Sequence, residues 1–131
     1  LSAYKIKPIW DSFITFDNAD AVEVNFTIDN KTIMPMSENQ KVLGRQRLLL
    51  TLINGKINET IIEYIPSDNF KGKMKDINSR NLKSKQFDGR IIFRNAASSL
   101  KTTWSLTNGK LLLKQITKNI KNQKMQQHID G

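Results

Sequence analysis

Two Asn-Gly pairs, each placed between two strand-like runs, constrain the fold of this chain most strongly. Asn54-Gly55 joins QRLLLTLI to KINETIIEYI, and Asn108-Gly109 joins TTWSLT to KLLLKQIT. Both residues of such a pair accept the positive φ angles of a type I′ turn, which connects antiparallel strands tightly. The sequence therefore predicts two β-hairpins.

Two further strands are predicted by their patterning. Residues 21–28 (AVEVNFTI) alternate strictly, so the four apolar side chains share one face and Glu23 lies on an opposite face expected to be wet. Residues 88–95 (DGRIIFRN) carry apolar side chains on one face and Arg90 and Arg94 on the other. The run QRLLLTLI is apolar on both faces, which is typical of a central strand covered on each side.

Together these elements predict a mainly β fold: a single antiparallel, curved sheet of about six strands in a meander, with little helix. Residues 1–118 form one β-rich domain, and residues 119–131 form a polar tail that is either flexible or a short helix. The lead over residues 1–20 has no clean period, and Pro8 blocks a helix through it, so a short lead that is either extended or irregular is expected. The alternative is an α+β fold, with one helix from the lead or the tail packed on the sheet.

Composition excludes several kinds of chemistry. The 131 residues include no cysteine and one histidine, His128 in the polar tail, so thiol nucleophiles, histidine-based triads and zinc sites lack their ligands. Glu59 and Glu63 would lie roughly 13 Å apart along one strand, too far for a shared site. We therefore predict no catalytic residue, metal or cofactor, and hence no enzyme. No apolar run approaches the roughly 18 residues that span a bilayer.

The charge balance suggests a polyanion partner as one alternative. Lysines and arginines number 21 against 12 acidic residues, a net charge of +9, and residues 66–87 are a basic stretch that interrupts the strand pattern. The candidate polyanion-binding residues are Lys71, Lys73, Lys75, Arg80, Lys83, Lys85, Arg90 and Arg94. The competing interpretation is an ordinary solvated face.

Two tryptophans are candidate ligand-facing aromatics. Trp104 alternates with Thr102 and Leu106, so it suits a core face as well as a ligand site. Trp10 belongs to an aromatic trio with Phe13 and Phe16, for which a plug closing one end of the sheet is the favoured interpretation.

The order of several short motifs resembles a domain of uncharacterised secreted or lipoprotein-type proteins from Bacteroidetes. The motifs are Trp10, VEVNF (22–26), LLLTLINGK (48–56), IIEYIPSDNF (61–70), FDGRIIF (87–93) and WSLTNGKL (104–111). The resemblance covers about residues 8–115 and departs from the family pattern at Asn25, at Asp88 and at AASS (96–99). It implies an extracytoplasmic location, in the periplasm, at the outer membrane surface or outside the cell. It supplies no catalytic residue.

Three functions follow as hypotheses. The first is a non-catalytic extracytoplasmic module that binds a protein or small ligand through its curved sheet. The second is a nucleic-acid or anionic-surface binder that uses the basic residues of 71–94. The third is an inhibitor or pro-domain of a neighbouring enzyme.

Overall fold

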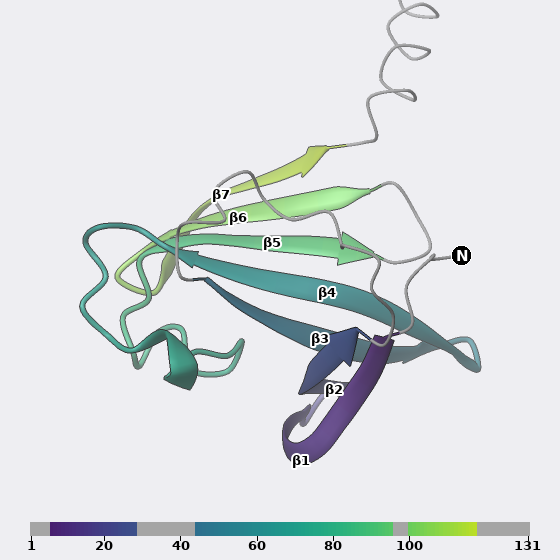
Figure 1. Ribbon diagram of the computed structural model, residues 1–131. Helices are drawn as coiled ribbons and strands as arrows, with labels where there is room; N and C mark the ends of the chain where they lie inside the picture. Colours follow the sequence, from purple (N-terminus) through teal and green to yellow (C-terminus); the bar gives the residue numbers. More distant parts are fainter. Residues whose placement is uncertain (1–5, 29–43, 96–99, 118–131) are drawn as a thin grey trace, which may run out of the picture.

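The computed structural model describes residues 6–28, 44–95 and 100–117, which form one unclosed antiparallel sheet (Figure 1). Its strands are β1 (Ile6–Phe16), β2 (Ala19–Ile28), β3 (Arg45–Ile53), β4 (Lys56–Pro66), β5 (Gly89–Asn95), β6 (Lys101–Thr107) and β7 (Lys110–Thr117). Neighbours in the chain are neighbours in the sheet, so the predicted meander is confirmed. The only helical segment in the described ranges is a 3₁₀ turn, η1 (Met74–Asp76), and the tail over 119–131 lies outside them.

The sheet has seven strands rather than six because the N-terminal lead is itself a strand. β1 pairs with β2 from Ile6 opposite Ile28 onward, so the lead is extended rather than irregular and is a full strand of the sheet. The register shifts between Ile9 and Phe13, and the residues between them break the alternation that would have marked a strand. Pro8 is tolerated because β1 is an edge strand, where a missing backbone N–H costs no ladder hydrogen bond.

Both Asn-Gly pairs form the predicted turns. The φ angles are 51° and 77° at Asn54 and Gly55, and 50° and 81° at Asn108 and Gly109. Two consecutive positive values are the signature of type I′, whose twist matches that of the flanking strands. The β3–β4 and β6–β7 hairpins are therefore confirmed.

One face of the sheet is covered by residues 67–88, the segment that connects β4 to β5 and contains η1. We call this the covered face. Its core includes Ile62 and Tyr64 of β4 and Ile91 of β5, against which the segment packs Ile77 and Phe87. All five side chains are at most 1% exposed, so an irregular segment supplies two of the six buried side chains of the principal core.

The opposite face carries a smaller core. Val24, Leu48 and Ile61 are buried there, from β2, β3 and β4. Leu49, the neighbour of Leu48, packs on the covered face, which confirms that β3 is a central strand with apolar side chains on both sides. The edge strand β7 is different, because its apolar side chains are more than 40% exposed at Leu111, Leu112, Leu113 and Ile116.

Candidate ligand pocket on the covered face

The covered face holds a pocket of about 420 Å³ beside the 67–88 segment. The pocket is lined by Phe16, Ala19, Ala21, Leu49, Thr51, Ile62, Tyr64, Ser79, Leu82, Ile91, Phe93 and Trp104. Most of these side chains are apolar or aromatic, and their polar groups are three hydroxyls and the indole N–H of Trp104. Volumes of roughly 300–1,000 Å³ with such a lining are typical of sites for small molecules.

Two elements distant in the sequence enclose this pocket. Figure 1 shows the β1–β2 hairpin inclined to strands β4, β5 and β6, on the same side of the sheet as the segment that carries η1. Phe16 and Ala21 line the pocket from the hairpin, and Ser79 and Leu82 line it from the segment. The Arg80 guanidinium joins the two by donating a hydrogen bond to the Thr15 carbonyl, at 3.1 Å.

The pocket has a floor and a mouth that differ in exposure. Ile62 and Tyr64 are at most 1% exposed and form the floor. Ala19, which pairs with Phe16 at the end of the β1–β2 hairpin, is exposed and marks the mouth. Arg80 is not one of the lining residues, but its guanidinium binds the carbonyl next to Phe16, so its exposed side chain lies beside the mouth.

Trp104 stands on the pocket wall, as one of the two tryptophans predicted to face a ligand. Its ring packs on Phe93, with centroids 4.9 Å apart, and the Lys114 ammonium lies 4.9 Å from the Trp104 ring centroid. Both aromatic rings line the pocket. They offer a ligand a flat apolar surface, and the partly exposed indole makes Trp104 a spectroscopic probe of that surface.

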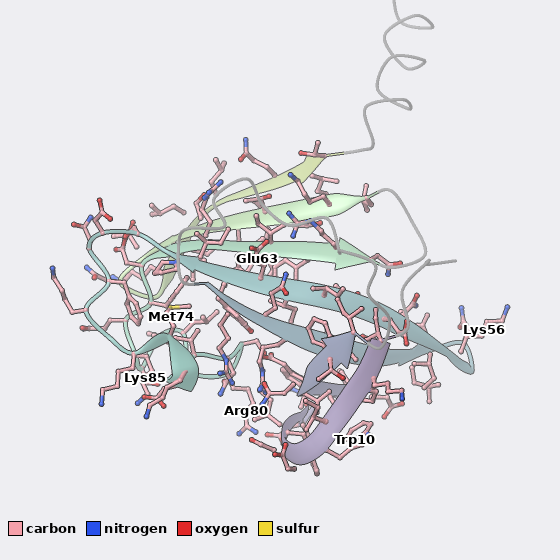
Figure 2. All side chains as sticks on the ribbon, viewed as in Figure 1. Trp10, Lys56, Glu63, Met74, Arg80 and Lys85 are labelled. Atoms are coloured by element: carbon pink, nitrogen blue, oxygen red, sulfur yellow. The ribbon has the colours of Figure 1, made fainter. Side chains whose placement is uncertain are left out.

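Trp10 does not share this site. It is 53% exposed and makes an edge contact with Phe13, itself 52% exposed, while only Phe16 of the predicted aromatic trio lines the pocket. Figure 2 shows Trp10 on the outer side of β1. The prediction of an aromatic plug was therefore wrong for Trp10 and Phe13.

A buried ion pair lies beside the pocket floor. The Glu23 carboxylate accepts a hydrogen bond from Arg47 Nε at 2.8 Å, and the two side chains are 0% and 2% exposed. Arg47 also donates to the Asn25 side-chain oxygen at 2.7 Å. Glu23 was expected on a wet face, but the 67–88 segment covers that face, so the expectation was wrong.

Both oxygens of the Glu23 carboxylate accept hydrogen bonds from other groups of the protein. Its Oε2 accepts from Arg47 and from the Tyr64 hydroxyl, at 2.9 Å, and its Oε1 accepts from both the backbone N–H and the hydroxyl of Ser79, at 3.2 and 2.5 Å. Four donors satisfy a carboxylate that offers about four lone-pair sites. Burial, followed by the charge of Glu23, raises the pKa of Tyr64 far above its usual range, so its hydroxyl stays a donor.

A second set of hydrogen bonds fixes the base of the 67–88 segment. The buried Asp88 carboxylate accepts from the Ser67 hydroxyl at 2.6 Å and from the backbone N–H of Asn108 at 3.1 Å. The Gly109 N–H donates to the Phe87 carbonyl at 2.7 Å. The β6–β7 turn therefore holds the end of the segment that brings Leu82 to the pocket.

The structure separates the eight basic residues predicted as one polyanion surface. The six on the 67–88 segment are all exposed, namely Lys71, Lys73, Lys75, Arg80, Lys83 and Lys85. Arg90 and Arg94 pair in β5 with Ile65 and Ile61 and share the opposite face with Ile61. Figure 2 shows Arg80 and Lys85 on the segment, away from that face.

Arg94 also forms an ion pair with Glu63. Its Nη1 donates to the Glu63 carboxylate at 2.8 Å. Glu63 is 5% exposed, so its carboxylate is buried in this pair. This ion pair joins β4 to β5 on the opposite face of the sheet.

The functional residues that sequence reasoning missed are Glu23, Arg47, Tyr64 and Ser79. A usable signal exists for the first two, because they are charges of opposite sign placed directly beside apolar strand positions: Glu23 lies between Val22 and Val24, and Arg47 precedes Leu48. No comparable signal marks Ser79, which lies in a polar run. Among the described residues no group of three histidine, cysteine or acidic side chains could hold a metal ion, and no helix there is long and apolar enough to cross a membrane.

Comparison of the chain with protein-family models, with curated proteins and with solved structures finds no match. The pocket is accordingly interpreted from its own geometry and chemistry.

Proposed function

We propose that this chain is a non-catalytic binding module that takes a small, largely apolar molecule into the pocket on the covered face. The observation that carries the proposal is the pocket itself, about 420 Å³ in volume and lined mainly by apolar and aromatic side chains. At about 30 Å³ per water-sized unit, this volume suits a ligand of roughly ten to fifteen non-hydrogen atoms. An extracytoplasmic location remains part of the proposal, on the strength of the motif resemblance over residues 8–115.

The chemistry of the lining supports binding rather than catalysis. Tyr64 is the one titratable side chain among the twelve lining residues, and its hydroxyl donates to Glu23. A serine nucleophile needs a base that can take its proton. Ser79 donates to Glu23, but that carboxylate already accepts from Arg47, Tyr64 and the Ser79 backbone, which leaves it no free lone pair.

Binding can be tested by the fluorescence of Trp104. In a Trp10→Phe background, which removes the exposed tryptophan outside the pocket, 1-decanol or decanoate should change Trp104 emission saturably, with one site per chain. Ala21→Phe should lower the affinity at least tenfold, because Ala21 lines the pocket and a benzyl group would fill it. Thr27→Phe, at an exposed position of the same strand, is the matched control and should bind as before. A flat response to both probes would contradict the proposal.

Polyanion binding is the second candidate, and one observation favours it. Six exposed cations lie on the single 67–88 segment. Electrostatic binding of this kind weakens steeply as salt rises, because binding releases counterions from the polyanion. A basic segment that contacts only the phosphate backbone, and does not stack on the bases of the nucleic acid, would bind with little sequence preference.

The triple substitution of Lys71, Lys73 and Lys75 by Glu should reduce binding to a 20-nucleotide single strand by at least tenfold at low salt. Arg90→Glu is the control, since Arg90 is exposed but lies on the opposite face of the sheet. Titration by fluorescence anisotropy at several salt concentrations measures both affinity and salt slope. Equal losses from the triple variant and from Arg90→Glu would show a general charge effect and reject the segment as the site.

A further inference from the structure

The pocket mouth carries a positive charge that the apolar lining does not explain. Arg80 follows Ser79, a wall residue, and its Nη1 donates to the carbonyl of Thr15, which precedes the wall residue Phe16. Arg80 is exposed, and this is its one side-chain hydrogen bond within the described residues. A guanidinium offers five N–H donors in a planar fork that matches a carboxylate or phosphate.

The interior of the pocket offers no comparable partner for an anion. Its polar side-chain groups are hydroxyls and the indole N–H of Trp104, and the hydroxyls of Tyr64 and Ser79 already donate their protons to Glu23. A charged head group inside would therefore lose its hydration and find only the neutral donors of Thr51 and Trp104, with no counter-charge, which is costly. An anionic ligand would have to keep its head group at the mouth and place only its apolar part inside.

From this arrangement we infer that the ligand is a singly charged anionic amphiphile, whose apolar chain occupies the pocket and whose carboxylate binds Arg80 at the mouth. The inference rests on the proposed function and adds the chemical class of the ligand and its recognition residue. Lys83 directly follows the wall residue Leu82 and is, with Arg80, the second cation of the 67–88 segment that directly follows a lining residue. Asp20 alternates with Ala19 and Ala21 along β2, so its carboxylate points away from the pocket.

Asp17 is a carboxylate that directly follows the wall residue Phe16. It lies in the turn between β1 and β2 and is exposed, so solvent screens its effect on a bound anion. Glu23 lies behind the pocket floor, but its charge is balanced by the ion pair with Arg47. The net field at the mouth therefore favours an anion.

Matched ten-carbon probes test the inference. In the Trp10→Phe background, decanoate should bind roughly fivefold more tightly than 1-decanol, which is the upper end of what a solvent-exposed ion pair contributes. Arg80→Gln should remove this preference by weakening decanoate alone, and Arg80→Lys should retain part of it. Raising the salt concentration should weaken decanoate and leave 1-decanol unchanged.

The control is Lys56→Gln, which removes one charge at the far β3–β4 turn, as Figure 2 shows, and should leave both affinities unchanged. Equal binding of decanoate and 1-decanol to the unsubstituted Arg80 protein would overturn the inference and leave the pocket proposal intact. An equal loss of affinity for decanoate and 1-decanol in Arg80→Gln would also overturn the inference and leave the pocket proposal intact. Failure of both probes to bind would instead reject the pocket as a ligand site.

Discussion

Replacing Glu23 by Ala should lower the free energy of unfolding by about 3–5 kcal/mol, the range found when one member of a buried ion pair is removed. Arg47 would keep its charge at 2% exposure without a counter-ion. The hydroxyls of Tyr64 and Ser79 would lose their acceptor at the same time. Urea unfolding followed by circular dichroism measures the change.

The buried pair on the opposite face provides the control. Glu63→Ala removes the partner of Arg94, whose side chain is 24% exposed and can regain water, so a smaller loss of about 1–2 kcal/mol is expected. Replacing Glu23, Arg47 and Tyr64 together by Leu, Met and Phe should recover most of the stability, because no charge is then left buried. Equal losses of unfolding free energy from Glu23→Ala and Glu63→Ala would show that the hydrogen bonds around Glu23 stabilise the fold no more than the Glu63–Arg94 pair does.

The same variant should loosen the 67–88 segment. Glu23 is the residue of β2 that binds the segment, through both the backbone and the hydroxyl of Ser79. The segment carries six lysines and arginines, so limited trypsin digestion reports directly on its opening. We expect Glu23→Ala to be cut within 67–88 at a protease concentration that leaves Glu63→Ala intact.

Local signals account for what could be predicted of the fold. The two Asn-Gly turns and the patterning of residues 21–28 and 88–95 each depend on residues close in the chain, and together they predicted six strands in the right order. β1 was missed because the residues between Ile9 and Phe13 interrupt its pairing with β2 and hide its period. Pro8 strengthened the wrong interpretation, since its effect depends on whether a strand lies at an edge.

The pocket could not be predicted in the same way. Alternation shows that Glu23 and Val24 point to opposite faces, but it does not show which face another part of the chain covers. Ser79, which covers Glu23, is 56 residues away in a segment without a regular period. Trp104 was recognised as a candidate because an aromatic residue in a strand signals a packed surface, whether the contact is core or ligand.

The second large loss of stability is expected from a substitution in the β6–β7 turn, because this turn contacts the segment that forms the pocket wall. Gly109→Ala should cost about 3–4 kcal/mol of unfolding free energy, whereas Gly55→Ala should cost about 1–2 kcal/mol. Both glycines have positive φ, 81° and 77°, so both variants suffer the strain of an L-residue in that region. The difference in the expected loss of unfolding free energy comes from the atoms that surround each glycine.

A Cβ at Gly109 would lie 2.6 Å from both the Leu82 carbonyl oxygen and the Lys83 Cα, while a Cβ at Gly55 would meet nothing within 4 Å. The contacted atoms are backbone, so relief requires the segment to move and strains the hydrogen bond from the Gly109 N–H to the Phe87 carbonyl. Because Leu82 lines the pocket, Gly109→Ala should also weaken decanoate binding, and Gly55→Ala should not. Equal stability and equal affinity in the two variants would show that the turn and the pocket wall are independent; unequal values would establish that the second Asn-Gly hairpin positions the ligand site.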